Sequence, residues 1–144
     1  MKQFDQKLYD ECDTPARAAA KSLLADLDVV VKESNLVGID LLLYKGDKQL
    51  AAVELEVRKG TSLHEIVNKP TVTYPARKQK FLEYEIPVIF VSFNSDCSEH
   101  YCAPGEWIRL SPLKFSEKLG EYFFHLDSRH VKMNGLRDMI KRLL

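Results

Sequence analysis

Three acidic residues lie inside two segments that otherwise read as apolar β-strands. Asp40 belongs to residues 38–44, and Glu54 and Glu56 belong to residues 50–58. Because side chains alternate between the two faces of a strand, the two glutamates project from one face, roughly 7 Å apart along the backbone. Neighbouring carboxylates repel each other, and their oxygens are the ligands that Mg²⁺ or Mn²⁺ prefers. This pattern indicates a site for a divalent cation.

The loop between the two strands decides whether Asp40 joins the glutamates. A two-residue loop at 46–47, where Gly-Asp signals a turn, places Asp40 opposite Val53. An unpaired carboxyl among apolar side chains costs roughly 2–7 kcal/mol or becomes protonated. A loop of three residues, 46–48, or of five residues places Asp40 opposite Glu54. The alternation favours the odd loop, which gathers six apolar side chains on the other face: Ile39, Leu41, Leu43, Val53, Leu55 and Val57.

The elements that carry these acids follow from start signals and periodicity. Thr14-Pro15 predicts the start of an amphipathic helix over residues 14–27. Three short strands follow, then an irregular segment, a second helix opened by Pro75, and an apolar run typical of a buried strand parallel to a neighbour. In order, these six segments are residues 28–34, 38–44, 50–58, 60–73, 76–84 and 87–93.

The last third of the chain has weaker signals. It predicts a strand near residues 101–102, a short helix around 111–118, a strand over 122–126 and a final helix over 136–144. The order is α-β-β-β-α-β with C-terminal additions, so we expect an α/β protein with a mixed central sheet flanked by helices. The length suits one domain that spans residues 1–144.

The element order and the acids together resemble the PD-(D/E)xK nuclease superfamily, whose restriction endonuclease-like core is αβββαβ. The family signature is an acid on one strand and then, after a hairpin, (D/E)-x-K on the next. Residues 38–40 (Gly-Ile-Asp) resemble the first part, and residues 53–56 (Val-Glu-Leu-Glu) resemble the second. The resemblance covers about residues 14–94. The chain departs from the family at Glu56, which stands at the usual lysine position.

The resemblance implies a metal-dependent endonuclease that hydrolyses phosphodiester bonds of DNA. Asp40 and Glu54 would hold Mg²⁺ or Mn²⁺, together with the Leu55 carbonyl. Glu56 would be a further ligand or would orient the attacking water. Loss of the lysine would alternatively mean a catalytically degenerate site.

Several basic residues are candidates for the role that the lysine has in the family. Arg58 lies on the same face of the strand as the acids. Strand alternation directs Lys59, the next residue, to the opposite face. Lys78 or Lys80 from the second helix would reach the site if that helix lies against it. Glu11 is a weaker candidate for an accessory acid ahead of the first helix. The sequence leaves these options open.

The segment after Pro75 interleaves the basic residues Arg77, Lys78 and Lys80 with aromatic residues. Together with Lys59, these side chains would contact DNA phosphates. An amphipathic helix with a basic outer side explains the same pattern without DNA.

Composition narrows the functional class. Lys+Arg and Asp+Glu each number 21, so the formal net charge is zero and only local basic patches would attract nucleic acid. Three cysteines do not make a disulfide framework, and residues 97–102 match no common zinc pattern, so we expect a reducing cytoplasm. The polar N-terminus and the absence of a long apolar run predict neither a signal peptide nor a membrane span.

Three interpretations therefore remain. The first is a Mg²⁺-dependent endonuclease that acts on DNA, as a homodimer or with a partner protein. The second is a catalytically degenerate protein of the same fold that binds nucleic acid or another protein. The third is an unrelated α/β interaction domain in which the acids lie on a solvated hairpin face.

Overall fold

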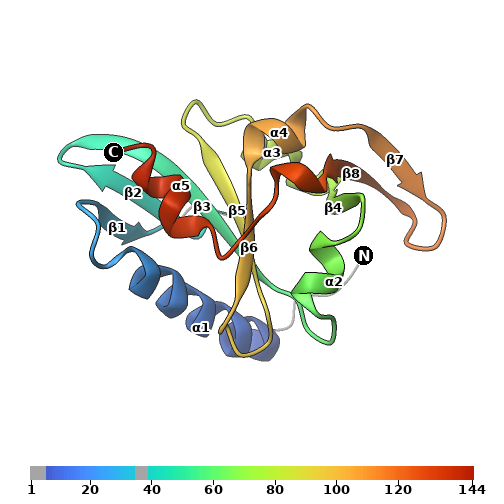
Figure 1. Cartoon of the computed structure of the whole chain (residues 1–144), viewed down its shortest axis with the longest axis horizontal. Helices are drawn as coiled ribbons and strands as arrows, with labels where there is room; N and C mark the ends of the chain where they lie inside the picture. The colour runs from blue at the N-terminus through green and yellow to red at the C-terminus, as the bar shows by residue number, and fades with distance from the viewer. Residues whose placement is uncertain (1–5, 35–38) are drawn as a thin grey trace.

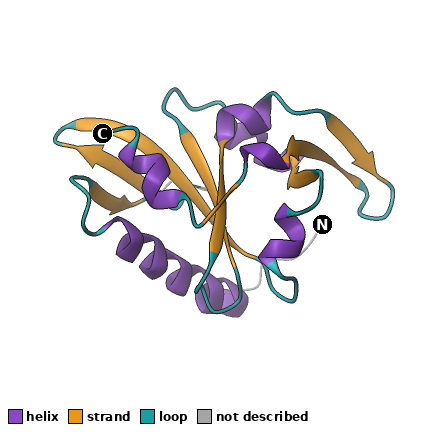
Figure 2. Cartoon of the chain, viewed as in Figure 1, coloured by secondary structure: helices purple, strands orange, loops and turns teal. Residues whose placement is uncertain are grey.

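The computed structural model describes residues 6–34 and 39–144, and its largest feature is a six-stranded sheet (Figures 1 and 2). Its strands are β1 (Val30–Glu33), β2 (Leu41–Lys45), β3 (Lys48–Val57), β5 (Val88–Phe93), β6 (His100–Pro104) and β9 (Lys132–Met133), adjacent in that order. The first three form an antiparallel meander, β5 runs parallel to β3, and β6 and β9 are antiparallel to their neighbours. This mixed sheet with flanking helices confirms the predicted fold class.

A second, antiparallel sheet has the strand order β4-β8-β7. Its strands are β4 (Thr71–Pro75), β7 (Leu113–Ser116) and β8 (Glu121–Asp127). The helical elements are α1 (Gln6–Leu24), α2 (Leu63–Val67), η1 (Ala76–Lys78), α3 (Gln79–Leu82), α4 (Gly105–Arg109), η2 (Ser128–His130) and α5 (Leu136–Lys141). Within the described residues, no helix combines the length and the apolar character needed to cross a bilayer.

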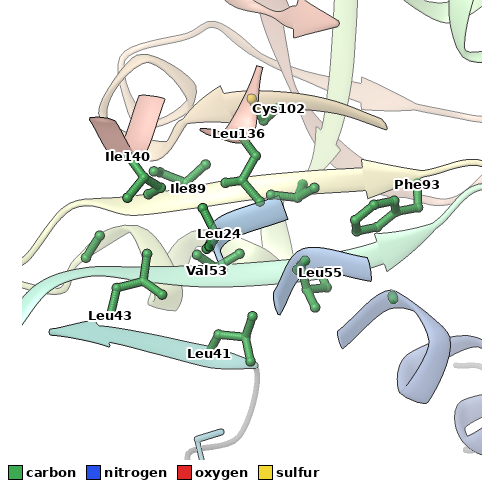
Figure 3. Close-up of a cluster of buried hydrophobic side chains, with 14 of the residues drawn as sticks. Leu24, Leu41, Leu43, Val53, Leu55, Ile89, Phe93, Cys102, Leu136 and Ile140 are labelled. Carbon is green, nitrogen blue, oxygen red and sulfur yellow. The ribbon is translucent and has the colours of Figure 1, made fainter. Parts of the chain in front are cut away.

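The two faces of the central sheet bury different clusters. On one face, α1 and α5 pack against the sheet through apolar side chains, among them Leu24 and Ile140 (Figure 3). On the other face, the second sheet and the short helices α2, α3 and α4 cover Ala52, Phe90 and Tyr101. Strand β3 serves both clusters, because its alternate side chains point to opposite faces.

Strands β2 and β3 pair in the predicted register, but the loop between them is shorter than predicted. Its loop is the two-residue Gly46-Asp47, with Lys45 paired to Lys48 and Gly46 at φ +59°, a conformation that favours glycine. The register then shifts, because Tyr44 pairs with Gln49 and Leu43 with Ala51. Leu50 is therefore the extra residue of a β-bulge. The three-residue loop was wrong, yet one inserted residue restores the expected register for Leu41 to Leu43.

Ile39 corrects the predicted apolar face. It was expected beside Leu41, but it packs in the cluster on the opposite side of the sheet with Ala52 and Leu63. Residues 39 and 40 precede the first residue of β2, so the strand alternation does not extend to Ile39.

The first helix begins earlier than predicted. It runs from Gln6 to Leu24, so Pro15 lies inside it rather than at its first turn. Residues 6–13 contain neither glycine nor proline, and nothing in them stops a helix upstream of Thr14. A proline within a helix removes one backbone hydrogen bond, but it does not have to end the helix.

Two segments in the second layer were also assigned wrongly. Residues 60–73 are not irregular throughout, because α2 buries Leu63 and β4 begins at Thr71. The helix expected around 111–118 is strand β7, which pairs with β8 across a turn closed by the Gly120 N–H and the Ser116 carbonyl (2.7 Å). This pairing joins β7 to a later part of the chain, so a local Ser-Pro start signal does not predict it.

Candidate active site

Asp40 lies directly before β2, and its carboxylate is held from two sides. Its N–H donates to the Val53 carbonyl (3.0 Å), and Val53 also pairs with Leu41, so Asp40 lies at the irregular end of the ladder, opposite Val53 and close to Glu54. The Leu55 N–H donates to Asp40 Oδ2 (2.7 Å), and Arg17 Nη2 donates to Oδ1 (3.1 Å). Strand β3 and helix α1 together therefore fix the direction of this carboxylate.

Glu54 is a buried carboxyl, only 4% exposed, on the face of β3 covered by the second layer. Lys78 Nζ, at the end of η1, donates to Glu54 Oε1. Burial raises the pKa of Glu54 to about 8; Lys78 acts against this rise, and the charges of Glu56 and Asp40 add to it. This environment is the opposite of the solvated hairpin face that the third interpretation required.

Glu56 lies two residues further along β3 and has different partners. Its Oε1 accepts hydrogen bonds from Ser92 Oγ of β5 and from Arg58 Nε (3.1 Å). Arg58 Nη2 also donates to the Thr73 carbonyl of β4 (3.3 Å). Glu56 and Arg58 thus connect the central sheet to the strand that leads into η1 and Lys78.

Two buried tyrosines lie behind this connection. Tyr74 of β4 and Tyr101 of β6 are 2% and 0% exposed, and burial raises the pKa of both phenols, with smaller effects from the nearby Glu56 and Arg58. Within the described residues neither hydroxyl has a hydrogen bond of ordinary geometry. Buried hydroxyls without such partners are uncommon.

The acids therefore meet three basic side chains, each from a different place in the chain. Asp40 pairs with Arg17 of α1, and Glu56 pairs with Arg58, which directly follows β3, both at 3.1 Å. Glu54 pairs with Lys78, which lies 24 residues later in the chain. The arrangement contains one acid directly before β2, a second acid on the adjacent strand β3, and a lysine in contact with the second.

A divalent cation fits the donor chemistry of Asp40 and Glu54. Among residues 6–34 and 39–144, no group of three or more His, Cys, Asp or Glu side chains is arranged to hold a metal ion. Asp40 and Glu54 nevertheless offer oxygen donors from neighbouring positions, and the charges of Asp40 and Glu56 disfavour ionisation of Glu54. A bound cation would remove that repulsion. Glu56 is already held by Ser92 and Arg58.

The other predicted basic residues lie outside this group. Lys59 follows the end of β3 and is exposed. Arg77 is also exposed and donates to Glu121 Oε1 (2.9 Å) and Oε2 (3.2 Å). The side chains of Lys80 and Glu11 lie outside the described part of the chain; the backbone places Glu11 within α1 rather than ahead of it.

Sequence reasoning missed two members of the site. Arg17 contacts Asp40 from α1, 23 residues earlier in the chain, and Ser92 contacts Glu56 from β5. Arg17 follows the buried Ala16, which indicates a position at the edge of the packed helix face. Ser92 stands in an otherwise apolar strand, VIFVSF, in which every residue is buried. A hydroxyl in such a strand was the available signal for a polar partner.

Comparisons with known proteins give structural likenesses and no family assignment. No protein-family model and no curated protein matches the sequence. Among solved structures, the chain is similar to Hjc from Archaeoglobus fulgidus, a Holliday junction resolvase from an archaeal hyperthermophile. The TM-score is 0.41 with 14% sequence identity, and the match covers 74% of this chain and 86% of that chain. At this level of similarity, the function has to be argued from the site itself.

Proposed function

We propose that this protein is a metal-dependent endonuclease of the PD-(D/E)xK type that hydrolyses phosphodiester bonds of DNA. The observation that carries the proposal is the contact of Lys78 Nζ with Glu54 Oε1, where Glu54 lies close enough to Asp40 for the charge of Asp40 to raise its pKa. The signature needs an acid, a second acid on the adjacent strand, and a lysine. Here the lysine comes from η1, because Glu56 occupies its usual place.

Each side chain would have a separate task. A Mg²⁺ or Mn²⁺ ion held by Asp40 and Glu54, with the Leu55 carbonyl, would polarise the scissile phosphate and lower the pKa of a bound water. Lys78 would donate a hydrogen bond to the phosphate oxygens, where negative charge increases in the transition state. Arg17 and the Leu55 N–H keep the Asp40 carboxylate in one orientation.

The main role of Glu56 and Arg58 would be to position Lys78. Glu56 accepts from Arg58 and Ser92, and Arg58 holds the Thr73 carbonyl of β4. Because η1 directly follows β4, this connection sets where Lys78 stands relative to Glu54. Arg58 also lies close enough to Glu56 to add positive charge beside the phosphate.

A second candidate function has a specific observation in its favour. Each acid has its own basic partner: Arg17 for Asp40, Lys78 for Glu54 and Arg58 for Glu56. Acids neutralised in this way do not need a cation to be stable. A protein of this fold that binds nucleic acid or another protein without cleaving it would show the same pairing.

The direct test is a cleavage assay with supercoiled plasmid and four-way-junction DNA in Mg²⁺, Mn²⁺ or EDTA. The proposal predicts nicking or strand cleavage that requires the metal and is lost in Asp40→Ala and Glu54→Ala. Lys118→Ala, which changes an exposed lysine in the β7–β8 turn, is the matched control and should cleave like the wild type.

Absence of cleavage in both metals would reject the enzyme. DNA binding that persists under those conditions would support the non-catalytic candidate. Sedimentation of the same preparations, with and without DNA, tests the proposed homodimer, because a dimer doubles the 16.6 kDa mass of the chain.

A further inference from the structure

A groove lies at the end of β3, beside the candidate active site. It has a volume of about 580 Å³ and is enclosed by the end of β3, the segment around α2, and β4 and β8 of the second sheet. Its polar lining includes Arg58, Lys59, Lys69, Thr71, Thr73 and His125. We call this feature the basic groove.

The charge of the basic groove has one sign. The lining contains an arginine, two lysines and a histidine, and no aspartate or glutamate is among the described residues that form it. The whole chain has 21 basic and 21 acidic residues, so this local excess is not a consequence of a basic protein. A concave surface lined by one sign of charge concentrates ligands of the opposite charge.

Two of these positive charges are not engaged elsewhere in the described structure. Lys59 and Lys69 are exposed, and neither side chain forms a hydrogen bond or an ion pair with any side chain or backbone group that the structure describes. Arg77, by contrast, is paired with Glu121 at 2.9 Å. The lysines of the groove therefore remain available for an anionic ligand, whereas Arg77 would first have to leave its carboxylate.

The groove is continuous with the candidate active site through Arg58. The Arg58 side chain lines the groove, donates to Glu56 and also donates to the Thr73 carbonyl, and Thr73 is itself part of the lining. Arg58 lies four residues from Glu54, which corresponds to about 13 Å along a strand. At the rise of B-DNA, that distance is about four nucleotides of one strand.

We propose that the basic groove binds the phosphodiester backbone of the DNA strand, several nucleotides away from the phosphate that is cleaved. This inference rests on the proposed function and adds the path of the substrate to it. Lys59 and Lys69 neutralise phosphates, and the Thr71 and Thr73 side chains provide hydroxyl groups near the same strand. Neither contact depends on the base sequence.

The test measures DNA binding without cleavage. Fluorescence anisotropy in EDTA, with labelled single-stranded and four-way-junction DNA, gives the dissociation constant across a series of salt concentrations. Lys59→Ala and Lys69→Ala should each weaken binding about three- to tenfold at 50 mM salt and lower the slope of log Kd against log salt by about one. The double variant should combine both losses.

The controls are Lys48→Ala and Lys118→Ala, which remove exposed lysines at the β2–β3 and β7–β8 turns. Both should bind DNA like the wild type. The proposal is overturned if the groove variants also bind like the wild type, or if the control variants lose as much affinity as they do. Circular dichroism of each variant checks that a loss of affinity is not a loss of folding.

The experiments can reject the groove proposal and the endonuclease proposal separately. If binding depends on Lys59 and Lys69 but no metal produces cleavage, the groove stands and the endonuclease is rejected. If the protein cleaves DNA and the groove variants bind and cleave normally, the endonuclease stands and the groove is rejected. Competition with inorganic phosphate tests whether the groove is a site for small anions. If it is, low millimolar phosphate should displace the DNA; if the groove needs a nucleic-acid strand, it should not.

Discussion

The two faces of β3 carry different kinds of side chain and have different surroundings. Val53 and Leu55 point to one face and pack among leucines from β2, α1 and α5 (Figure 3). Glu54 and Glu56 point to the other face, where they meet Lys78, Arg58 and Ser92. One strand therefore supplies the core of the protein and the groups that would carry its chemistry.

This difference separates stability from function. The apolar face stabilises the fold by removing side chains from water, at about 25 cal/mol per Å² of buried surface. The acidic face does the reverse, because burial raises the pKa of Glu54 and leaves the hydroxyls of Tyr74 and Tyr101 without good partners. Proteins tolerate such local costs at functional sites.

The largest expected effect is on catalysis. Glu54→Gln keeps the shape of the side chain and an oxygen for Lys78, but it removes the charge that would hold a metal. Cleavage should fall by at least about a thousandfold, equivalent to about 4 kcal/mol of transition-state stabilisation. The melting temperature should stay the same or rise at pH 8. A destabilised Glu54→Gln would show that the buried carboxylate supports the fold.

The next effect is on stability and belongs to the apolar face. Leu41→Ala removes a fully buried side chain next to Val53 and should lower the free energy of unfolding by about 2–5 kcal/mol. Urea titration measures this change. At a temperature where the variant is folded, its cleavage rate should match the wild type, and a large loss of rate would mean that the two faces are coupled.

The pH dependence of stability should reveal Glu54. Its pKa is raised from 4.5 to about 8 in the folded protein, so the protonated form is favoured by folding. Stability from this group is complete below pH 4.5 and is lost as the pH rises towards 8, by up to about 5 kcal/mol. Urea titrations in EDTA from pH 5 to pH 8.5 should show a steeper decline for the wild type than for Glu54→Gln. Parallel curves would contradict the assignment.

His100 should produce a smaller dependence of the opposite sign. It is buried beside Phe93, and its Nε2 accepts from the Leu136 N–H (3.1 Å), which requires the neutral ring. Burial lowers the pKa of His100 below 6.5, so its contribution is present above pH 6.5 and is lost as the pH falls through the folded pKa. In His100→Gln, the decline in stability between pH 7 and pH 5 should be reduced.

The smallest effect is expected from Tyr101→Phe. The variant removes a buried hydroxyl that has no hydrogen bond of ordinary geometry in the described structure, so stability should change by less than about 1 kcal/mol or increase slightly. Thermal unfolding measures this change. A loss of several kcal/mol would show that the hydroxyl has a partner, such as an ordered water between Ser92 and Arg58.

The comparison also shows what the sequence was able to predict. Apolar alternation in β2 and β3 predicted the register in which Leu41 pairs with Val53 and Leu43 with Ala51, because the alternative buries an acid among leucines. That register does not extend to Asp40, whose N–H donates to the Val53 carbonyl. The β-bulge that produces this register was not predictable, since nothing in the residues around Leu50 distinguishes a bulge from a longer loop. The parallel strand from Val88 to Phe93 followed from its continuous apolar run.

The partners of the acids depend on tertiary packing and were harder to predict from the sequence. Lys78 was one of several basic candidates, and only the position of η1 after β4 brings it to Glu54. Arg17 and Ser92 come from elements whose faces had not been assigned to the site. The role of each residue in cleavage and in DNA binding stays a prediction.

The most direct test of the central claim is the rate of Mg²⁺-dependent DNA cleavage by Lys78→Met, measured under single-turnover conditions beside wild type and Lys118→Met. If Lys78 replaces the lysine missing at position 56, its removal should lower the cleavage rate by at least about a hundredfold, while DNA binding in EDTA changes by less than tenfold. Lys78→Arg should restore part of the rate. A Lys78→Met protein that cleaves as fast as the wild type and Lys118→Met would contradict the account.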